Sequence, residues 1–283
     1  MSQHFSSPPP AVPDVIVSSP KPHVLLVTLN RPAQLNALPR RMHFALDRLW
    51  AWYDAEPKLR CAVITGKGRA FCAGADLKEW HDVNNERESK KTAGGGDGEK
   101  WADNGFGGLS NRRGKKPVIA AVNGLCFGGG MEMVLNVDLV IASSAAKFGL
   151  PEVTRGVVAI AGALPRLIRS VGRQRASEMA LLGRPYTAAQ MEGWGLVNAV
   201  VSPEKVVEEA LNWAAEMAGN SPDAVIVSRD GLLGGWDAED PKKSTARVDH
   251  GPLYQGLDGG ENMKEGVLSF VEKRKAVWKD SKL

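Results

Sequence analysis

Two glutamates, each lying among apolar residues, are candidates for chemistry. Glu132 follows three consecutive glycines and is flanked by Met131 and Met133. Glu152 lies in the segment FGLPEV, directly after a short apolar run. Burying a carboxylate costs free energy, and carboxylates with perturbed pKa values gather at functional sites. An alternative role for Glu152 is that of a first-turn glutamate, which favours the positive end of a helix dipole.

Two glycine-rich turns each separate an apolar run from a helical pattern. They lie within residues 65–78, TGKGRAFCAGADLK, and residues 118–135, VIAAVNGLCFGGGMEMVL. Glycine allows a tight turn and brings backbone N–H groups close to a ligand, and the first N–H groups of a helix have no partner within it. Two such donors could form an oxyanion hole. The alternative is that these glycines only allow a helix to pack closely on a sheet.

The elements that must position these residues alternate along the chain. Apolar runs of strand length are separated by helical patterns, which favours an α/β fold with mainly parallel strands. The predicted strands are 24–29, 62–65, 118–122, 137–142 and 196–201, and the predicted helices are 39–55 and 203–218.

The two ends of the chain differ from this core. Residues 1–22 are rich in proline and serine and are predicted to form a disordered tail. Residues 221–280 contain helical patterns at 222–233 and 261–278 but no strand-like run. The polar, glycine-rich stretch between 80 and 116 is expected to be a loop beside the site.

Composition excludes several classes of protein. Thirty-six basic and 32 acidic residues leave a net charge of +4, which gives no basis for nucleic acid as the main partner. The three cysteines lack CxxC spacing, and the five histidines lack ligand spacing, so we expect no disulfide framework and no metal. The most apolar stretch, 118–142, is interrupted by polar residues, so we expect no membrane span.

Several segments together resemble the enoyl-CoA hydratase/isomerase, or crotonase, superfamily: AFCAGADLKE, KKPVIAAVNGLCFGGGMEM, FGLPE, GLVN and FVEKRKAVWKD. The resemblance extends from His23 to Asp280. It implies an α/β fold in which a crotonase-like spiral of repeated ββα units occupies residues 23–220. A C-terminal α-helical region for trimerisation would occupy 221–280, giving a homotrimer or hexamer. It also implies an acyl-CoA substrate and no cofactor, because the coenzyme A thioester is itself the substrate carrier.

The same resemblance assigns roles to four residues. The thioester carbonyl would accept hydrogen bonds from the N–H groups of Ala75 and Gly129, which stabilise the enolate. Glu132 would activate water, and Glu152 would deliver a proton to Cα. The presence of both glutamates predicts an enoyl-CoA hydratase, which adds water syn and reversibly to a 2-trans-enoyl-CoA to give a 3-hydroxyacyl-CoA.

Further residues are expected to bind substrate. Ala73, together with Asp76, Leu77 and Lys78, falls where the family lines the adenine and phosphates of coenzyme A, and Lys273 lies in the matching C-terminal segment. The sequence departs from the family at Ile160, which replaces a glycine near the reacting water. This isoleucine is predicted to reshape the acyl pocket.

Alternatives remain open at this point. Within the enzyme class they are an enoyl-CoA isomerase, a 3-methylglutaconyl-CoA-type hydratase and a carnitinyl-CoA-type dehydratase or racemase. Outside it they are a catalytically weak acyl-CoA-binding subunit, motivated by Ile160, and an RNA-binding protein, which the modest charge disfavours.

The final residues indicate a cellular address. Ser281, Lys282 and Leu283 form the tripeptide SKL, which at a free carboxyl terminus is read by the peroxisomal import receptor. We therefore expect the protein to reside in the peroxisome.

Overall fold

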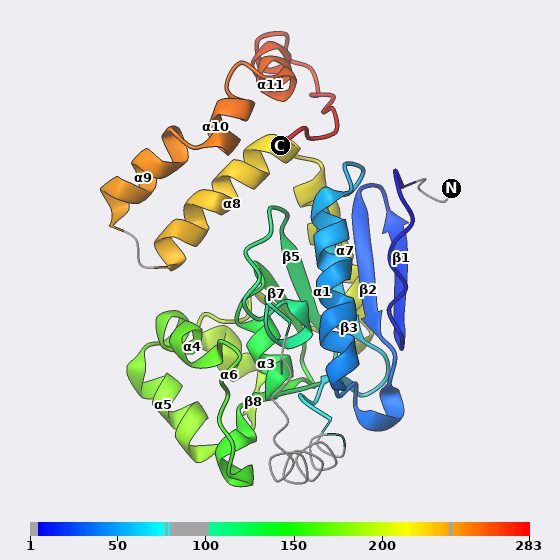
Figure 1. Ribbon diagram of the computed structural model, residues 1–283, viewed down its shortest axis with the longest axis vertical. Helices are drawn as coiled ribbons and strands as arrows, with labels where there is room; N and C mark the ends of the chain where they lie inside the picture. Colours follow the sequence, from blue (N-terminus) through cyan, green and yellow to red (C-terminus); the bar gives the residue numbers. More distant parts are fainter. Residues whose placement is uncertain (1–4, 77–78, 80–101, 238–239) are drawn as a thin grey trace, which may run out of the picture.

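The computed structural model describes residues 5–76, 79, 102–237 and 240–283, and its core contains two β-sheets (Figure 1). The larger sheet has the order β1-β2-β3-β5-β7-β10, and all its neighbours are parallel except β1 and β2. Its strands are β1 Val15–Lys21, β2 Val24–Leu29, β3 Cys61–Gly66, β5 Val118–Val122, β7 Leu139–Ser143 and β10 Ala199–Val201. The smaller sheet consists of β4 Ala70–Cys72, β6 Leu125–Phe127, β8 Lys147–Gly149 and β9 Tyr186–Thr187.

The chain builds the two sheets together, one strand of each at a time. In three successive turns it forms a strand of the larger sheet and then a strand of the smaller one: β3 then β4, β5 then β6, β7 then β8. Each new strand pairs in parallel with the equivalent strand of the preceding turn. This is a spiral of repeated ββα units, so the predicted fold class is confirmed.

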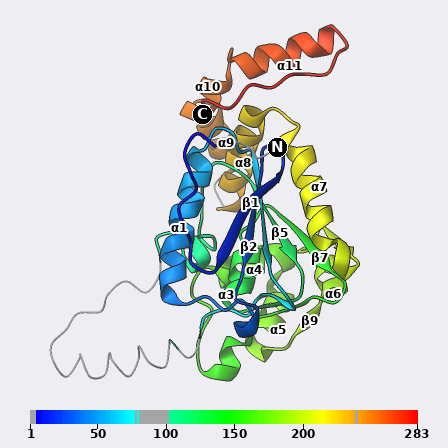
Figure 2. The same cartoon turned by 90° about the vertical axis from the view of Figure 1, so that its right-hand side faces the viewer.

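Helices cover the sheets and extend beyond them (Figure 2). One face of α1, which carries Met42, Leu46, Leu49 and Trp50, is buried in the main core, and α7 packs on the larger sheet in a second apolar cluster. The α-helices are α1 Arg40–Ala55, α3 Gly129–Val134, α4 Ala163–Val171, α5 Arg173–Leu182, α6 Ala188–Gly193, α7 Val206–Ala218, α8 Pro222–Trp236, α9 Pro241–Asp249, α10 Pro252–Leu257 and α11 Glu261–Val271. Short 3-10 helices are η1 Pro32–Gln34, η2 Phe106–Gly108, η3 Pro151–Arg155 and η4 Pro203–Lys205.

The N-terminal segment corrects one prediction. A disordered tail was expected over residues 1–22, but residues 15–21 form strand β1, which pairs antiparallel with β2. Burial alternates along β1, so Val15 and Val17 pack against the core while their neighbours face solvent. The backbone N–H of Ser6 also donates to Glu56 Oε2 at 2.8 Å. The open edge of β2 explains the strand, because unpaired backbone groups there need a partner.

The C-terminal helices α10 and α11 lie at the opposite end of the molecule from α3 (Figures 1 and 2). The last helix ends at Val271, seven residues before the predicted end at Trp278, and Lys273 adopts a left-handed conformation with φ of 53°. The segment that follows returns to the core, where Trp278 Nε1 donates to Gly219 O at 2.8 Å. Among the described residues, no helix is long and apolar enough to cross a membrane.

Candidate active site

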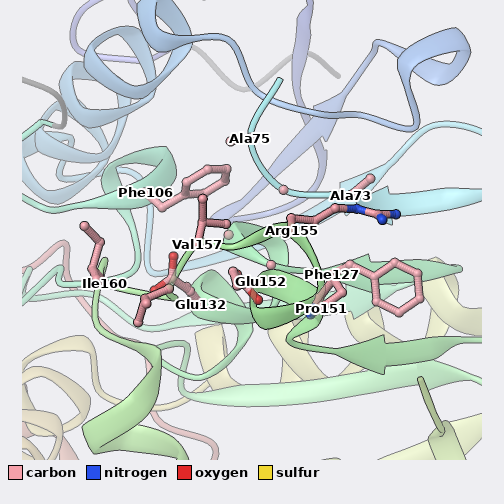
Figure 3. Close-up of a pocket in the computed structure, with 14 residues that line it drawn as sticks. Ala73, Ala75, Phe106, Phe127, Glu132, Pro151, Glu152, Arg155, Val157 and Ile160 are labelled. Atoms are coloured by element: carbon pink, nitrogen blue, oxygen red, sulfur yellow. The ribbon is translucent and has the colours of Figure 1, made fainter. Parts of the chain in front are cut away.

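A mainly apolar cavity of about 240 Å³ lies where the first turns of α3 and η3 meet the end of β4 (Figure 3). It brings together Glu132, Glu152, Ala75, Gly129, Ala73 and Ile160, which the sequence placed far apart. The other lining residues are Gly74, Phe106, Phe127, Gly128, Pro151, Arg155, Val157 and Val158.

Two backbone N–H groups at this cavity are available to a ligand. Leu38 pairs with Ala75 in a parallel bridge, in which Leu38 donates to Gly74 O and accepts from Asp76 N. This pattern uses the peptide groups on either side of Ala75 and leaves its own N–H outside the ladder. Gly129 is the first residue of α3, so its N–H has no acceptor within the helix. Neither N–H has a hydrogen-bond partner among the described residues.

Glycine is required where these two segments meet. Gly74 has φ of +96°, and a Cβ built on it would lie 3.2 Å from the nitrogen of Gly129. Gly128, with φ of +56°, would bring a Cβ to 3.1 Å from Glu152 Oε1. Both positions combine a left-handed backbone with close approach, which only glycine tolerates without strain. The glycines therefore do more than pack a helix on a sheet, because they bring the two N–H groups and Glu152 to one cavity.

Glu132 is buried, with 4% of its surface exposed, and its carboxylate is held by backbone donors. Oε1 accepts from Ala161 N at 2.8 Å and from Ala163 N at 3.3 Å. Burial raises the pKa of Glu132 to about 7, and the nearby Glu152 adds to this rise, while the two N–H donors oppose it. At neutral pH this carboxyl can therefore either accept or donate a proton.

Glu152 is the second residue of η3 and faces the same cavity (Figure 3). Its Oε2 is buried and has no hydrogen-bond partner within the part of the chain that the structure describes. Burial raises the pKa of this carboxyl as well. A buried acceptor without a hydrogen-bond partner is costly in a folded protein. Such an acceptor is typical of a group whose partner is a bound ligand.

The substrate-binding predictions have mixed outcomes. Ala73 and Ile160 line the cavity, and Ile160 is 66% exposed, which is unusual for isoleucine and consistent with a wall for an apolar group. Asp76 instead forms an ion pair with Arg31 at 3.0 Å and is absent from the cavity wall. Leu77 and Lys78 lie outside the described residues, as does most of the predicted loop at 80–116.

Lys273 is not brought to this cavity within its own chain. It follows α11, which lies at the far end of the molecule from α3. The reason is that α8 contacts the ββα core through the Arg229–Asp138 ion pair, whereas α10 and α11, which lead to Lys273, lie at the other end of the molecule (Figure 1).

Sequence reasoning missed several residues of the wall. Phe106 and Phe127 line the cavity, and Val157 and Val158 add to its apolar surface. Arg155 brings a guanidinium to the side of Ala73, away from Ile160 (Figure 3). Its position three residues after Glu152 was a usable signal, because η3 presents both residues at one cavity.

The chain is similar to known proteins over almost its whole length. Residues 20–281 match the family described as enoyl-CoA hydratase/isomerase. The chain is 66% identical to a mevalonyl-coenzyme A hydratase of Beauveria bassiana, with 99% of each chain covered. It is 50% identical to a mevalonyl-coenzyme A hydratase of Aspergillus fumigatus, covering 97% of this chain and 98% of that one. The crystal structure of an enoyl-CoA hydratase from Mycobacterium tuberculosis matches with a TM-score of 0.83 and 30% identity, covering 95% of this chain and 100% of that one.

The fold and these relatives together define a crotonase-family coenzyme A hydratase. The chain belongs to the enoyl-CoA hydratase/isomerase family. It is an enzyme of the hydratase type within that family.

Proposed function

We propose that the protein interconverts mevalonyl-CoA, a 3-hydroxyacyl-CoA with a 3-methyl group, and the corresponding 2-enoyl-CoA by reversible loss and addition of water. The observation that carries the chemistry is the convergence of Glu132, Glu152 and two available N–H groups on one apolar cavity. The choice of substrate is supported by two relatives that match almost the whole chain and are both named mevalonyl-coenzyme A hydratase.

Each group has a step in the proposed reaction. The N–H groups of Ala75 and Gly129 receive the thioester oxygen and stabilise the enolate that forms at Cα. In hydration, ionised Glu132 removes a proton from water as its oxygen bonds to Cβ, and protonated Glu152 gives a proton to Cα. In dehydration the same atoms move in reverse, so Glu152 takes the Cα proton and Glu132 protonates the departing hydroxyl. The two carboxyls interact, so an ionised Glu152 raises the pKa of Glu132.

The acyl side of the cavity suits a branched chain. Val157 and Ile160 present apolar side chains near Glu132 (Figure 3), and Val158 also lines the cavity. A 3-methyl group on Cβ would cover part of this apolar surface, and each buried carbon contributes about 0.8 kcal/mol. The alternative of a catalytically weak acyl-CoA binder, motivated by Ile160, has less support, since Ile160 leaves both carboxyls at the cavity.

The direct test incubates purified protein with 5-hydroxy-3-methylpent-2-enoyl-CoA and with unbranched crotonyl-CoA, following loss of the conjugated-thioester absorbance. We expect faster turnover of the branched substrate, with mevalonyl-CoA as product. Glu132→Gln and Glu152→Gln should each lower kcat at least about 100-fold while a saturated thioester, butanoyl-CoA, still binds. Full turnover by both variants, or no turnover of either enoyl-CoA, would refute the proposal.

The proposal includes peroxisomal residence, supported by the tripeptide Ser281–Lys282–Leu283. A fluorescent protein fused to the N-terminus should accumulate in peroxisomes, and Leu283→Asp should leave it in the cytosol. Equal distribution of the two fusions would contradict this part of the proposal.

A further inference from the structure

A buried hydroxyl, that of Ser110, joins two loops close to Glu132 without lining the cavity. Ser110 is fully buried, and its Oγ accepts from the N–H of Phe106 at 2.8 Å. The same hydroxyl donates to the carbonyl of Ala161 at 2.6 Å. One side chain thus connects the loop that carries η2 to the loop that precedes α4. Both bonds run to backbone groups, so they fix the loops and not other side chains.

Ala161 is hydrogen-bonded to both Ser110 and Glu132. Ala161 accepts from Ser110 through its carbonyl and donates through its N–H to Glu132 Oε1 at 2.8 Å. Any shift of Ala161 therefore changes the distance to the carboxylate. Of the two N–H donors on this oxygen, Ala161 is the nearer, since Ala163 lies at 3.3 Å.

The η2 loop is itself anchored, so it provides a fixed point for this connection. The N–H of Gly107 donates to His43 Nδ1 at 3.0 Å, and the His43 ring lies 4.5 Å from that of Phe106, centroid to centroid. Burial lowers the pKa of His43 to about 4, so Nδ1 remains an acceptor at neutral pH. The Phe106 ring in turn packs against Gly129, where a Cβ would lie 2.3 Å from its Cε2. The η2 loop therefore contacts Gly129 through Phe106. Through Ser110 it also contacts Ala161, which donates to Glu132.

We propose that Ser110 is a positioning residue, which fixes the Ala161 peptide and through it the orientation of the Glu132 carboxylate. Ser110 does not line the cavity. Small displacements of a catalytic group reduce rate strongly, because reaction requires a narrow range of geometries. The inference rests on the proposed role of Glu132 as the group that exchanges a proton with water.

Three substitutions separate positioning from simple packing. Ser110→Ala removes the hydroxyl, Ser110→Cys keeps the side-chain size but weakens both hydrogen bonds, and Ser110→Thr restores a hydroxyl. Ser143→Ala is the matched control, because Ser143 is equally buried and its Oγ accepts from Ala145 N at 3.2 Å, away from the cavity. The measurements are kcat and KM for the enoyl-CoA from pH 5.5 to 9, and butanoyl-CoA binding.

We expect Ser110→Ala and Ser110→Cys to lower kcat about tenfold with KM changed less than twofold, and Ser110→Thr to recover most of the loss. Weaker donation from Ala161 also destabilises ionised Glu132, so the acid limb of kcat/KM should move to higher pH in both variants. Ser143→Ala should change neither kcat nor the position of the acid limb.

Two results would overturn the inference. If Ser110→Cys folds and keeps the wild-type kcat and acid limb, the hydroxyl does not position Glu132. If the Ser110 variants lose activity without movement of the acid limb, the hydroxyl has only a structural role. The Glu132→Gln variant is measured in parallel. If it is active, the proposed function itself is refuted. If it is inactive while the Ser110 variants keep wild-type activity, only the inference about Ser110 is refuted.

Discussion

At the scale of single residues, the burial of Glu132 opposes folding and supports chemistry. The carboxyl is 4% exposed, and its pKa is raised to about 7 in the folded chain. In the unfolded chain it would titrate near its ordinary value of about 4.3. Below both values the carboxyl is protonated in both states, so its titration does not change the stability. As pH rises toward 7 the unfolded chain loses its proton first, so the folded state loses relative stability.

This linkage predicts that Glu132→Gln stabilises the protein at high pH. Glutamine has similar size, carries no charge to desolvate and can still accept from Ala161 N. The gain in the free energy of unfolding should be about 2 kcal/mol larger at pH 8 than at pH 5. Urea unfolding of the wild type and the variant at the two pH values measures this difference.

The control for this measurement is Glu208→Gln, because Glu208 is exposed on α7. Its effect on the free energy of unfolding should be the same at the two pH values. An equal effect of Glu132→Gln at pH 5 and pH 8 would contradict the raised pKa. A loss of stability at pH 8 would show that glutamine cannot replace the carboxylate between the backbone donors.

At the scale of elements, the site forms where equivalent turns of the spiral lie side by side. Cys72 at the end of β4 pairs in register with Cys126 in β6. Ala75 and Gly129 each follow three residues after one of these cysteines. Parallel pairing of two successive ββα turns thus brings two N–H groups, distant in sequence, to one cavity. The next turn, through β8, adds Glu152, because β8 pairs with β6 and leads directly into η3.

This repetition explains which features could be predicted from sequence. Strand β2 at 24–29 and strand β5 at 118–122 were predicted with their observed bounds, because each is a continuous apolar run with clear breaks. Strand β1 was missed, since only its alternate residues are half-buried and its pairing depends on the edge of β2.

Within the site, the conspicuous residues were found and the supporting ones were not. Glu132 stood out because it is charged in an apolar segment. Ser110 and Ala161 carry no such signal, since their roles depend on hydrogen bonds between loops 51 residues apart. Asp76 was assigned to substrate from the family motif, although its carboxylate neutralises Arg31. The local sequence identifies charged groups that are costly to bury. Hydrogen-bond and ion-pair partners that are distant in sequence are identified only from the three-dimensional structure.

At the scale of the whole molecule, α11 leaves a broad apolar surface uncovered. Val267, Phe270 and Val271 are 64%, 85% and 70% exposed on this helix, and Leu268 is 48% exposed. Contiguous exposed apolar side chains of this kind mark surfaces that another molecule covers. The proposed homotrimer or hexamer, expected from the family resemblance, would supply that cover from copies of the same chain. It would also give Lys273, which follows α11, a neighbouring subunit to contact.

The final prediction is that α11 holds the subunits together. Sedimentation equilibrium of the wild type should give three or six times the chain mass of 30.4 kDa. The double substitution Phe270→Asp with Val271→Asp places two charges on the apolar surface, and desolvating them on association would cost several kcal/mol, so a lower assembly or monomer is expected. Lys264→Glu, a charge change at an exposed polar position on the same helix, should leave the assembly intact. A doubly substituted protein that sediments like the wild type would show that α11 is not part of the interface. A monomeric wild type would show that no homotrimer or hexamer forms.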